Sequence, residues 1–270
     1  MRKSRTNRQK SNKPIVIGSI IVAILILISV GVYIYRDTLF TGEDKKETET
    51  SAGVEQSDKP KSNNESSAVQ TPDEKKEEKP TFEIGEGGYP VDVKEAEEPT
   101  YIDGVLIANK KYPLPKDFDP GENPEARAAL DQMAADAKKA GFELVAFSGY
   151  RSYEYQTQLY TNYANRDGKE AADRYSARPG HSEHQTGLAF DIGEKGQEDL
   201  WLTEEFGETP AGKWLVENAH NYGFILRFPE GKEDVTGFMY ESWHFRYLGE
   251  DVAEKVHQTG LTLEEYLGIE

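Results

Sequence analysis

The sequence of 270 residues contains no cysteine. This absence excludes disulfide bonds, thiolate metal ligands, a cysteine nucleophile and a lipid-modified N-terminal cysteine. A metal site in this chain must therefore use histidine, aspartate or glutamate. Histidine is itself scarce, with five residues in the whole chain, so the candidate ligands are few.

Positive charge is also in short supply. The formal net charge is −17, and from Thr81 onward 37 Asp and Glu residues stand against 18 Lys and Arg residues. Contacts to phosphate groups need Lys and Arg, so an acidic domain of this kind is a poor partner for nucleic acid. The sequence predicts a soluble acidic domain that binds no nucleic acid and stays off an anionic bilayer surface.

The N-terminal end has the opposite character. Residues 1–13 carry six basic residues and no acid, and residues 15–35, IVIGSIIVAILILISVGVYIY, carry no charge. At 1.5 Å per residue, 21 apolar residues can cross a hydrocarbon core of about 30 Å. They predict an anchor over residues 14–36, with 1–13 in the cytoplasm and the rest outside. A cleaved signal peptide is the alternative, although its apolar region is usually about 7–15 residues long.

Residues 37–82 are rich in Glu, Lys, Ser, Thr and Asp and contain few large apolar side chains. Such a segment cannot bury enough surface to offset the entropy lost on ordering, so it is predicted as a disordered linker. Residues 83–270 form the predicted folded domain. The anchor, the linker and the lack of cysteine together predict a protein of the cell membrane, with its domain on a Gram-positive cell surface.

A helix is predicted over residues 123–140. Asn123 suits the N-cap, Pro124 the first turn and Gly141 the position just past the end. The approximate apolar face of this helix consists of Ala128, Leu130, Met133 and Ala137.

Helices and strands alternate along the rest of the domain without a βαβ rhythm. Short apolar runs predict strands at 144–147, 188–192, 224–228 and 243–248, and helices are predicted at 152–165, 210–222 and 250–258. Thr262 and Glu265 form a capping-box pattern. Parallel crossovers are scarce in this pattern, which indicates an α+β fold with a small mixed or antiparallel sheet and flanking helices.

Three segments carry residues suited to chemistry. The first is Ser148-Gly-Tyr-Arg-Ser152, the second is Pro179-Gly-His-Ser-Glu-His-Gln-Thr-Gly-Leu-Ala-Phe-Asp191, and the third is Glu241-Ser-Trp-His244. A catalytic zinc typically takes three protein ligands and leaves one position for water. His220 and His257 fall late in predicted helices, where a cation is favoured, and are more simply helix-end residues. His181, His184 and His244 remain as candidates.

Asp191 ends an apolar run, and an ionised carboxylate there is costly unless it meets a cation or a metal. Ala189 shares its face of the predicted strand and leaves room for an ion and a substrate. Gly187 lets the chain bend between His184 and the strand. His184 and Asp191 could therefore converge on one point. Positions three apart on a regular strand face opposite sides, so Glu241 could join them if the backbone turns before His244 or if Glu241 sits in a loop just before the strand.

The pattern Ser182-x-His184-x-x-Gly187-x-Ala189-x-Asp191, followed by Glu241-x-x-His244, resembles the signature of the D-alanyl-D-alanine carboxypeptidase family. That family includes the vancomycin-resistance carboxypeptidases and dipeptidases and is grouped with phage endopeptidases and the hedgehog N-terminal fold. All five fixed positions of the first motif are matched, and the Arg151 segment matches as well. The resemblance covers roughly residues 100–250.

The resemblance implies particular roles for these residues. It implies that His184, Asp191 and His244 bind Zn²⁺, that Glu241 is the general base, and that Arg151 stabilises developing negative charge. It also points to Ser182 and, more weakly, to Gln156 as residues that bind the substrate. For these two the alternatives are an ordinary turn residue and an exposed helix residue, and for Arg151 a buried ion pair. His181 is interpreted as facing the substrate or supporting the site, not as a ligand.

The resemblance implies a membrane-anchored zinc carboxypeptidase that hydrolyses the C-terminal D-alanine from peptidoglycan stem peptides, as a DD- or LD-enzyme. Two alternatives stay open. One is a zinc-containing module that binds wall peptide without cleaving it, against which Glu241 and Arg151 argue, because binding alone needs neither. The other is a peptidoglycan endopeptidase. The sequence leaves open whether the substrate is a tetrapeptide or a pentapeptide.

Overall fold

The computed structural model describes residues 81–92 and 94–270. The predicted cytoplasmic segment 1–13, the anchor 14–36 and nearly all of the linker 37–82 lie outside these residues. Within the described part of the chain, no helix has both the length and the apolar character that crossing a membrane requires.

The domain contains two small antiparallel sheets together with helices, which confirms the predicted α+β class. A two-stranded sheet pairs β1 with β2, and a four-stranded sheet has the order β3-β4-β6-β5. The strands are β1 (Thr100–Ile102), β2 (Val105–Ile107), β3 (Leu144–Ser148), β4 (Ala189–Glu194), β5 (Phe224–Leu226) and β6 (His244–Tyr247). The strands of the larger sheet lie within the four predicted segments or overlap them, whereas β1 and β2 were not predicted.

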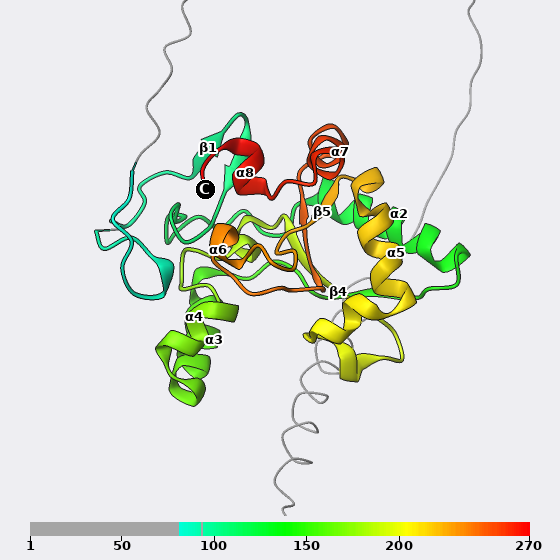
Figure 1. Cartoon of the computed structure of the whole chain (residues 1–270), viewed down its shortest axis with the longest axis horizontal. Coiled ribbons are helices and arrows are strands. Elements are labelled where there is room, and N and C mark those ends of the chain that lie inside the picture. Colours follow the sequence, from blue (N-terminus) through cyan, green and yellow to red (C-terminus); the bar gives the residue numbers. More distant parts are fainter. Residues whose placement is uncertain (1–80, 93) are drawn as a thin grey trace, which may run out of the picture. The chain divides into compact units, whose positions relative to one another are not determined.

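The helices surround the larger sheet (Figure 1). The α-helices are α2 (Pro124–Lys139), α3 (Tyr153–Asp167), α4 (Lys169–Tyr175), α5 (Pro210–Asn218), α6 (Glu233–Thr236), α7 (Glu250–Thr259) and α8 (Leu263–Leu267). Short 3₁₀ turns are η1 (Glu86–Gly88), η2 (Glu183–Thr186), η3 (Glu198–Leu200), η4 (Glu204–Glu208) and η5 (Ala219–Tyr222). The helices α4 and α6 were not predicted, since each is too short to show a periodic pattern.

The predicted caps are present. Asn123 Oδ1 accepts the backbone N–H of Ala126 at the start of α2. At α8, Thr262 and Glu265 form both hydrogen bonds of a capping box. The predicted apolar face of α2 needs one correction, because Ala128 is exposed and Ala126 is buried in its place. The helix is rotated so that Ala126, Leu130, Met133 and Ala137 face the core, a spacing of four, three and four residues that fits one helical stripe.

The main apolar core lies on one face of the larger sheet, between the sheet and the helices α2 and α5. Phe190, Ile192, Phe224 and Phe245 point into this core from the strands, and Leu215 reaches it from α5. These side chains are almost fully buried. Their burial is the dominant favourable term for folding, at roughly 1.5–3 kcal/mol for each large apolar side chain.

A second apolar cluster covers part of the opposite face. It joins Val105 and Ile107 of β2 and Ile225 of β5 to residues of α7 and α8, including Val256 and Leu263. Side chains alternate along a strand, so Ile225 faces this cluster while its neighbour Phe224 faces the main core. The rest of this second face carries the polar residues described next.

Candidate metal centre and active site

The polar face of the larger sheet brings two of the predicted ligands together. Asp191 on β4 and His244 on β6 are directly paired across the antiparallel strands. Cβ atoms of such pairs lie about 4.5–5.5 Å apart on one face, so this register alone makes the two side chains neighbours. His184 lies in η2, which comes just before β4, and it is buried beside them.

The three side chains direct their donor atoms at one another. Asp191 Oδ1 lies 3.3 Å from His184 Nε2 and 3.3 Å from His244 Nδ1. One donor atom from each residue lies within 4.8 Å of the others. Asp191 Oδ1 is buried and has no hydrogen-bond partner. A buried carboxylate oxygen is normally satisfied, so the orphaned oxygen between two imidazole nitrogens fits the donor set of a divalent cation.

The other ring nitrogen of each histidine is held by the protein. His184 Nδ1 lies 2.7 Å from the carbonyl oxygen of Gly149, and His244 Nε2 lies 3.3 Å from Glu183 Oε2. A nitrogen that donates to an oxygen acceptor leaves the opposite nitrogen with its lone pair. Both contacts therefore favour the tautomers in which His184 Nε2 and His244 Nδ1 are free to bind a cation.

The electrostatics of this cluster are those of a carboxylate among cationic groups. Burial alone would raise the pKa of Asp191, but His184 and Arg151 lower it well below its usual range. Burial and the nearby Arg151 lower the pKa of His184 to about 4. The pKa of His244 is raised to about 9, because Asp191 and Glu183 outweigh the effect of burial.

Glu241 lies immediately before β6, in a turn closed by a hydrogen bond from the His244 backbone N–H to the Glu241 carbonyl at 3.2 Å. This turn resolves the spacing problem, because it places Glu241 and His244 on the same side although they are three residues apart. Glu241 Oε2 is 3.6 Å from His244 Nδ1. Burial raises the pKa of Glu241 to about 8, and Asp191 adds to that shift while His244 opposes it.

Arg151 follows an irregularity in the pairing of β3 with β4, between Ala146 and Ser148. Such bulges re-aim the chain near functional sites. The Arg151 backbone N–H donates to the His184 carbonyl at 3.2 Å. Its guanidinium donates to Ser148 Oγ, at 3.0 Å from Nε and 2.7 Å from Nη2, and forms an ion pair with Asp191 Oδ2. The Arg151 side chain remains 20% exposed, so solvent reaches a group that is also ion-paired.

Gly187 ends η2 in the left-handed conformation, with φ at 71°. A Cβ atom at this position would lie 2.0 Å from the carbonyl oxygen of Gly121. Both the conformation and the close approach therefore require glycine, which supports the expected bend between His184 and the strand.

The two predicted substrate-binding residues are both buried. Ser182 precedes η2, and Gln156 lies in α3 with 2% of its surface exposed. The alternative of an exposed helix residue is therefore wrong for Gln156. Its Nε2 donates to the Ala177 carbonyl at 2.7 Å, and its Oε1 has no hydrogen-bond partner. The structure shows where these side chains lie, and their contact with a substrate stays a prediction.

The other histidines lie outside the cluster of donor atoms. The imidazole of His181 is buried, and its Nδ1 lies 2.8 Å from the carbonyl oxygen of Asn109. His220 and His257 stack face to face with ring centroids 3.6 Å apart, next to Glu254 of α7. His220 lies in η5 and His257 in the last turn of α7, in keeping with the expected helix-end positions.

Three charged residues next to the cluster were not singled out from the sequence. Glu183 contacts His244 directly, and Arg227 and Arg246 each contact Glu183. All three are buried. The sequence could have indicated Arg246, because it is a charged residue in an apolar strand, two residues from His244. Asp191 was singled out for the same reason, as a charged residue in an apolar run. The role of Glu183 depends on a tertiary contact that local sequence does not reveal.

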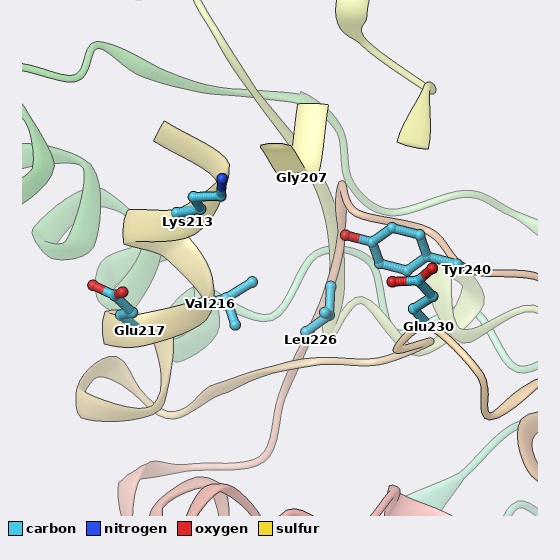
Figure 2. A pocket seen from close by; sticks show the side chains of 7 residues that line it. All are labelled: Gly207, Lys213, Val216, Glu217, Leu226, Glu230 and Tyr240. Carbon is cyan, nitrogen blue, oxygen red and sulfur yellow. The ribbon is translucent and has the colours of Figure 1, made fainter. Parts of the chain in front are cut away.

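Two surface cavities lie apart from the donor atoms. The larger has a volume of about 270 Å³ and is formed by Lys213, Val216 and Glu217 of α5 together with Leu226, Glu230, Tyr240 and Gly207 (Figure 2). Leu226 belongs to the side of the sheet that faces the main apolar core. The second, of about 140 Å³, is bounded by Pro179, Gly180 and His181, just before Ser182.

Comparison with known proteins gives the family. A sequence model of the D-alanyl-D-alanine carboxypeptidase family (VanY) matches residues 121–250. The chain is 36% identical over 253 residues to the putative carboxypeptidase YodJ of Bacillus subtilis (strain 168), an alignment that covers 85% of this chain and 89% of that protein.

Two solved structures are similar to this chain. The LdcB LD-carboxypeptidase shares 51% identity at a TM-score of 0.56, over 62% of this chain and 86% of that one. A mutant of the vancomycin-resistance D,D-pentapeptidase VanY, solved in complex with Zn(II), shares 34% identity at a TM-score of 0.52, over 60% of this chain and 97% of that one. The chain thus belongs to the D-alanyl-D-alanine carboxypeptidase family and is a carboxypeptidase.

Proposed function

We propose that this protein is a membrane-anchored zinc carboxypeptidase that removes the C-terminal D-alanine from peptidoglycan stem peptides. The observation that carries the proposal is the convergence of His184, Asp191 and His244 around one orphaned carboxylate oxygen. The family relationship supports the substrate class, since the similar proteins include an LD-carboxypeptidase and a D,D-pentapeptidase.

Zinc fits the donor atoms of this site. Two imidazole nitrogens and one carboxylate oxygen are a ligand set that catalytic zinc uses, and no other group of at least three His, Asp or Glu residues with donor atoms this close occurs among the described residues. The similar VanY structure contains Zn(II). A zinc ion held by these three residues would supply a Lewis acid that polarises a carbonyl and makes water nucleophilic near neutral pH.

Glu241 is proposed as the general base. Its carboxylate lies on the same side as the three donor atoms, and burial raises its pKa towards neutral pH, whereas a bound divalent cation would lower that pKa. A group with a pKa near the working pH can both take a proton and release it. Glu241 would accept the proton of the attacking water and then donate it to the amine of the departing D-alanine.

Arg151 and Ser182 are proposed to bind the negatively charged groups of the substrate. Arg151 keeps its positive charge and offers a planar set of donors that suits an oxyanion or a carboxylate. Ser182 can donate one hydrogen bond to the terminal carboxylate. The Nε2 atom of Gln156 already donates to the Ala177 carbonyl, so its unpartnered Oε1 is the atom that this residue offers to a ligand N–H group.

The location of the protein is part of the proposal. Residues 14–36 would anchor the chain, residues 1–13 would stay in the cytoplasm, and the linker 37–82 would hold the catalytic domain at the outer side of a Gram-positive membrane. Protease added to intact protoplasts tests this arrangement. Loss of the domain epitope, with retention of an N-terminal tag, agrees with the proposal, and protection of the domain contradicts it.

The activity is tested by incubating the zinc-loaded protein with defined tetrapeptide and pentapeptide stems and identifying the products by mass spectrometry. Release of D-alanine by the wild-type protein, and its loss in Glu241→Gln, is the expected result. Cleavage inside the stem would instead indicate an endopeptidase. Binding of the peptides without any cleavage would indicate a zinc-containing binding module.

A further inference from the structure

A network of buried ion pairs extends from the His244 ring on the side away from the predicted metal-binding atoms. Glu183 Oε2 faces His244 Nε2, and Glu183 Oε1 accepts hydrogen bonds from Arg227 Nε and Arg246 Nη1, both at 2.8 Å. Arg227 then forms a two-pronged contact with Glu264, at 2.8 Å from Nη1 to Oε2 and 2.5 Å from Nη2 to Oε1. The side chains of these four charged residues are each at most 3% exposed.

Two further hydrogen bonds connect these charged residues to β2 and to the segment that follows it. Asn109 Nδ2 donates to Glu264 Oε1 at 3.1 Å, and Arg246 Nη2 donates to the Leu106 carbonyl of β2 at 2.7 Å. Glu264 lies in α8, whose neighbouring residues Leu263 and Leu267 pack into the second apolar cluster. The carboxylate of Glu264 is therefore held by a helix that is itself capped and buried.

These contacts cross the limits of the family match. Glu183, Arg227 and Arg246 lie inside residues 121–250, whereas Asn109 and Glu264 lie outside them, one on each side. Two buried arginines and two buried glutamates balance one another in charge, so removal of one carboxylate would leave an uncompensated guanidinium. The segments that flank the matched region thus complete a network that ends on a predicted metal ligand.

We propose that Glu183, Arg227 and Glu264 are positioning residues of the metal centre, through which the C-terminal helix α8 orients His244. The inference rests on the proposed function, because it assumes that His244 binds the metal. Glu183 accepts the Nε2–H group and so keeps the Nδ1 lone pair directed at Asp191 and His184. Arg227 and Glu264 hold the Glu183 carboxylate at the angle that this hydrogen bond needs.

The physical reason for such a network is that a lone carboxylate would not be held rigidly enough. A carboxylate that bonds a ligating histidine raises the basicity of that ligand and fixes the orientation of its ring, and loss of such a partner typically costs about 10- to 100-fold in metal affinity or activity. A planar guanidinium that bonds a carboxylate through two parallel contacts fixes its orientation more firmly than a single contact does. The competing explanation is that the network stabilises the fold alone.

The test compares zinc affinity, measured on the full chain by competition with a chromophoric chelator, among wild type, Glu183→Gln and Glu264→Gln. We expect a loss of about 10- to 100-fold for Glu183→Gln and a loss at the lower end of that range for Glu264→Gln. The double variant should lose less than the product of the two single losses, because both act on His244 through the same contact. The visible absorption spectrum of the cobalt-substituted protein should change in both single variants.

The matched control is Asp173→Asn. Asp173 is buried and paired with Arg178, at 2.7 Å from Nη2 to Oδ2, outside the chain of contacts to His244. This variant should lower the melting temperature while zinc affinity and the cobalt spectrum stay at wild-type values. If Glu264→Gln does not fold, Arg227→Lys replaces it, because lysine keeps the charge and loses the two-pronged contact.

The inference is overturned if the variants in the network lower only the melting temperature and leave zinc affinity and the cobalt spectrum unchanged. In that case wild-type binding of one zinc per chain would leave the proposed function standing. If the wild-type protein itself binds no zinc, the proposed function fails and the inference fails with it.

Discussion

The two faces of the four-stranded sheet are built on different principles. On β4 and β6, Phe190 and Phe245 face the apolar core, as does Phe224 of β5, whereas Asp191 and His244 face the candidate site. Dispersion and hydrophobic burial act without direction, so an apolar face tolerates substitutions that keep its volume. A buried polar face is less tolerant, because every charge needs its partner.

This difference explains how a small sheet can be both stable and reactive. Neighbouring residues on one strand belong to opposite faces, so a shift of one residue in the pairing of β4 with β6 would exchange the two faces. The apolar face therefore fixes the register that sets Asp191 opposite His244. Changes on the polar face should affect metal binding and turnover, and changes on the apolar face should affect folding.

The largest effect is expected at Glu241. Replacement of Glu241 by glutamine removes the proposed proton acceptor while the size of the side chain is kept, and turnover should fall about 100- to 10,000-fold. Zinc content and melting temperature should stay close to those of wild type. Release of D-alanine by Glu241→Gln at the wild-type rate would contradict the role of this residue.

On the apolar face, Phe224→Ala tests the opposite expectation. Phe224 is completely buried in the main core, and its truncation should lower the free energy of unfolding by about 3–5 kcal/mol. Urea denaturation measures this loss. The turnover of the fraction that remains folded should stay within a few-fold of wild type, and an unchanged unfolding free energy would argue against the described core.

Arg151→Ala probes the polar face at the edge of the site. Loss of a donor to developing negative charge typically reduces turnover about 100- to 1000-fold, which is about 2.7–4 kcal/mol in the activation free energy. Arg151 also pairs with Asp191, so zinc affinity must be measured alongside turnover. A fall in zinc affinity with unchanged turnover at saturating zinc would assign Arg151 to the structural ion pair alone.

The smallest expected effect is a difference in stability between two glycine substitutions. It distinguishes the cost of the backbone conformation from the cost of a steric contact at the turn that places His184 on the polar face. Gly187 and Gly260 both have left-handed backbones, with φ at 71° and 66°. A Cβ atom at Gly260 would meet nothing within 4 Å, whereas one at Gly187 would meet the Gly121 carbonyl at 2.0 Å. Gly260→Ala should cost about 1–2 kcal/mol of stability. Thermal unfolding should show that Gly187→Ala costs about 1–3 kcal/mol more, and equal losses would contradict the close approach.

Local sequence was sufficient for much of the framework of the site. The cap at Asn123, the capping box at Thr262 and the strands around Asp191 and His244 follow from patterns a few residues long. A turn or a loop before β6 was anticipated as the way for Glu241 and His244 to share one side, and the structure has a turn there. The convergence of His184, Asp191 and His244 was expected from the motifs, and their donor atoms lie close together in the structure.

What sequence could not supply depends on contacts between distant segments. Glu183 and Glu264 are 81 positions apart, yet both bond Arg227. The burial of Gln156 and the exposure of Ala128 likewise depend on how each helix is rotated against its neighbours, which a weak apolar pattern does not fix. The strands β1 and β2 have three residues each, too few to show alternation.

The most direct test of the account is anomalous X-ray diffraction at the zinc absorption edge from crystals of the protein grown with zinc. The account predicts one peak, bonded to His184 Nε2, Asp191 Oδ1 and His244 Nδ1 at about 2.0–2.2 Å. No peak among these three atoms, or a peak held by other residues, would contradict it.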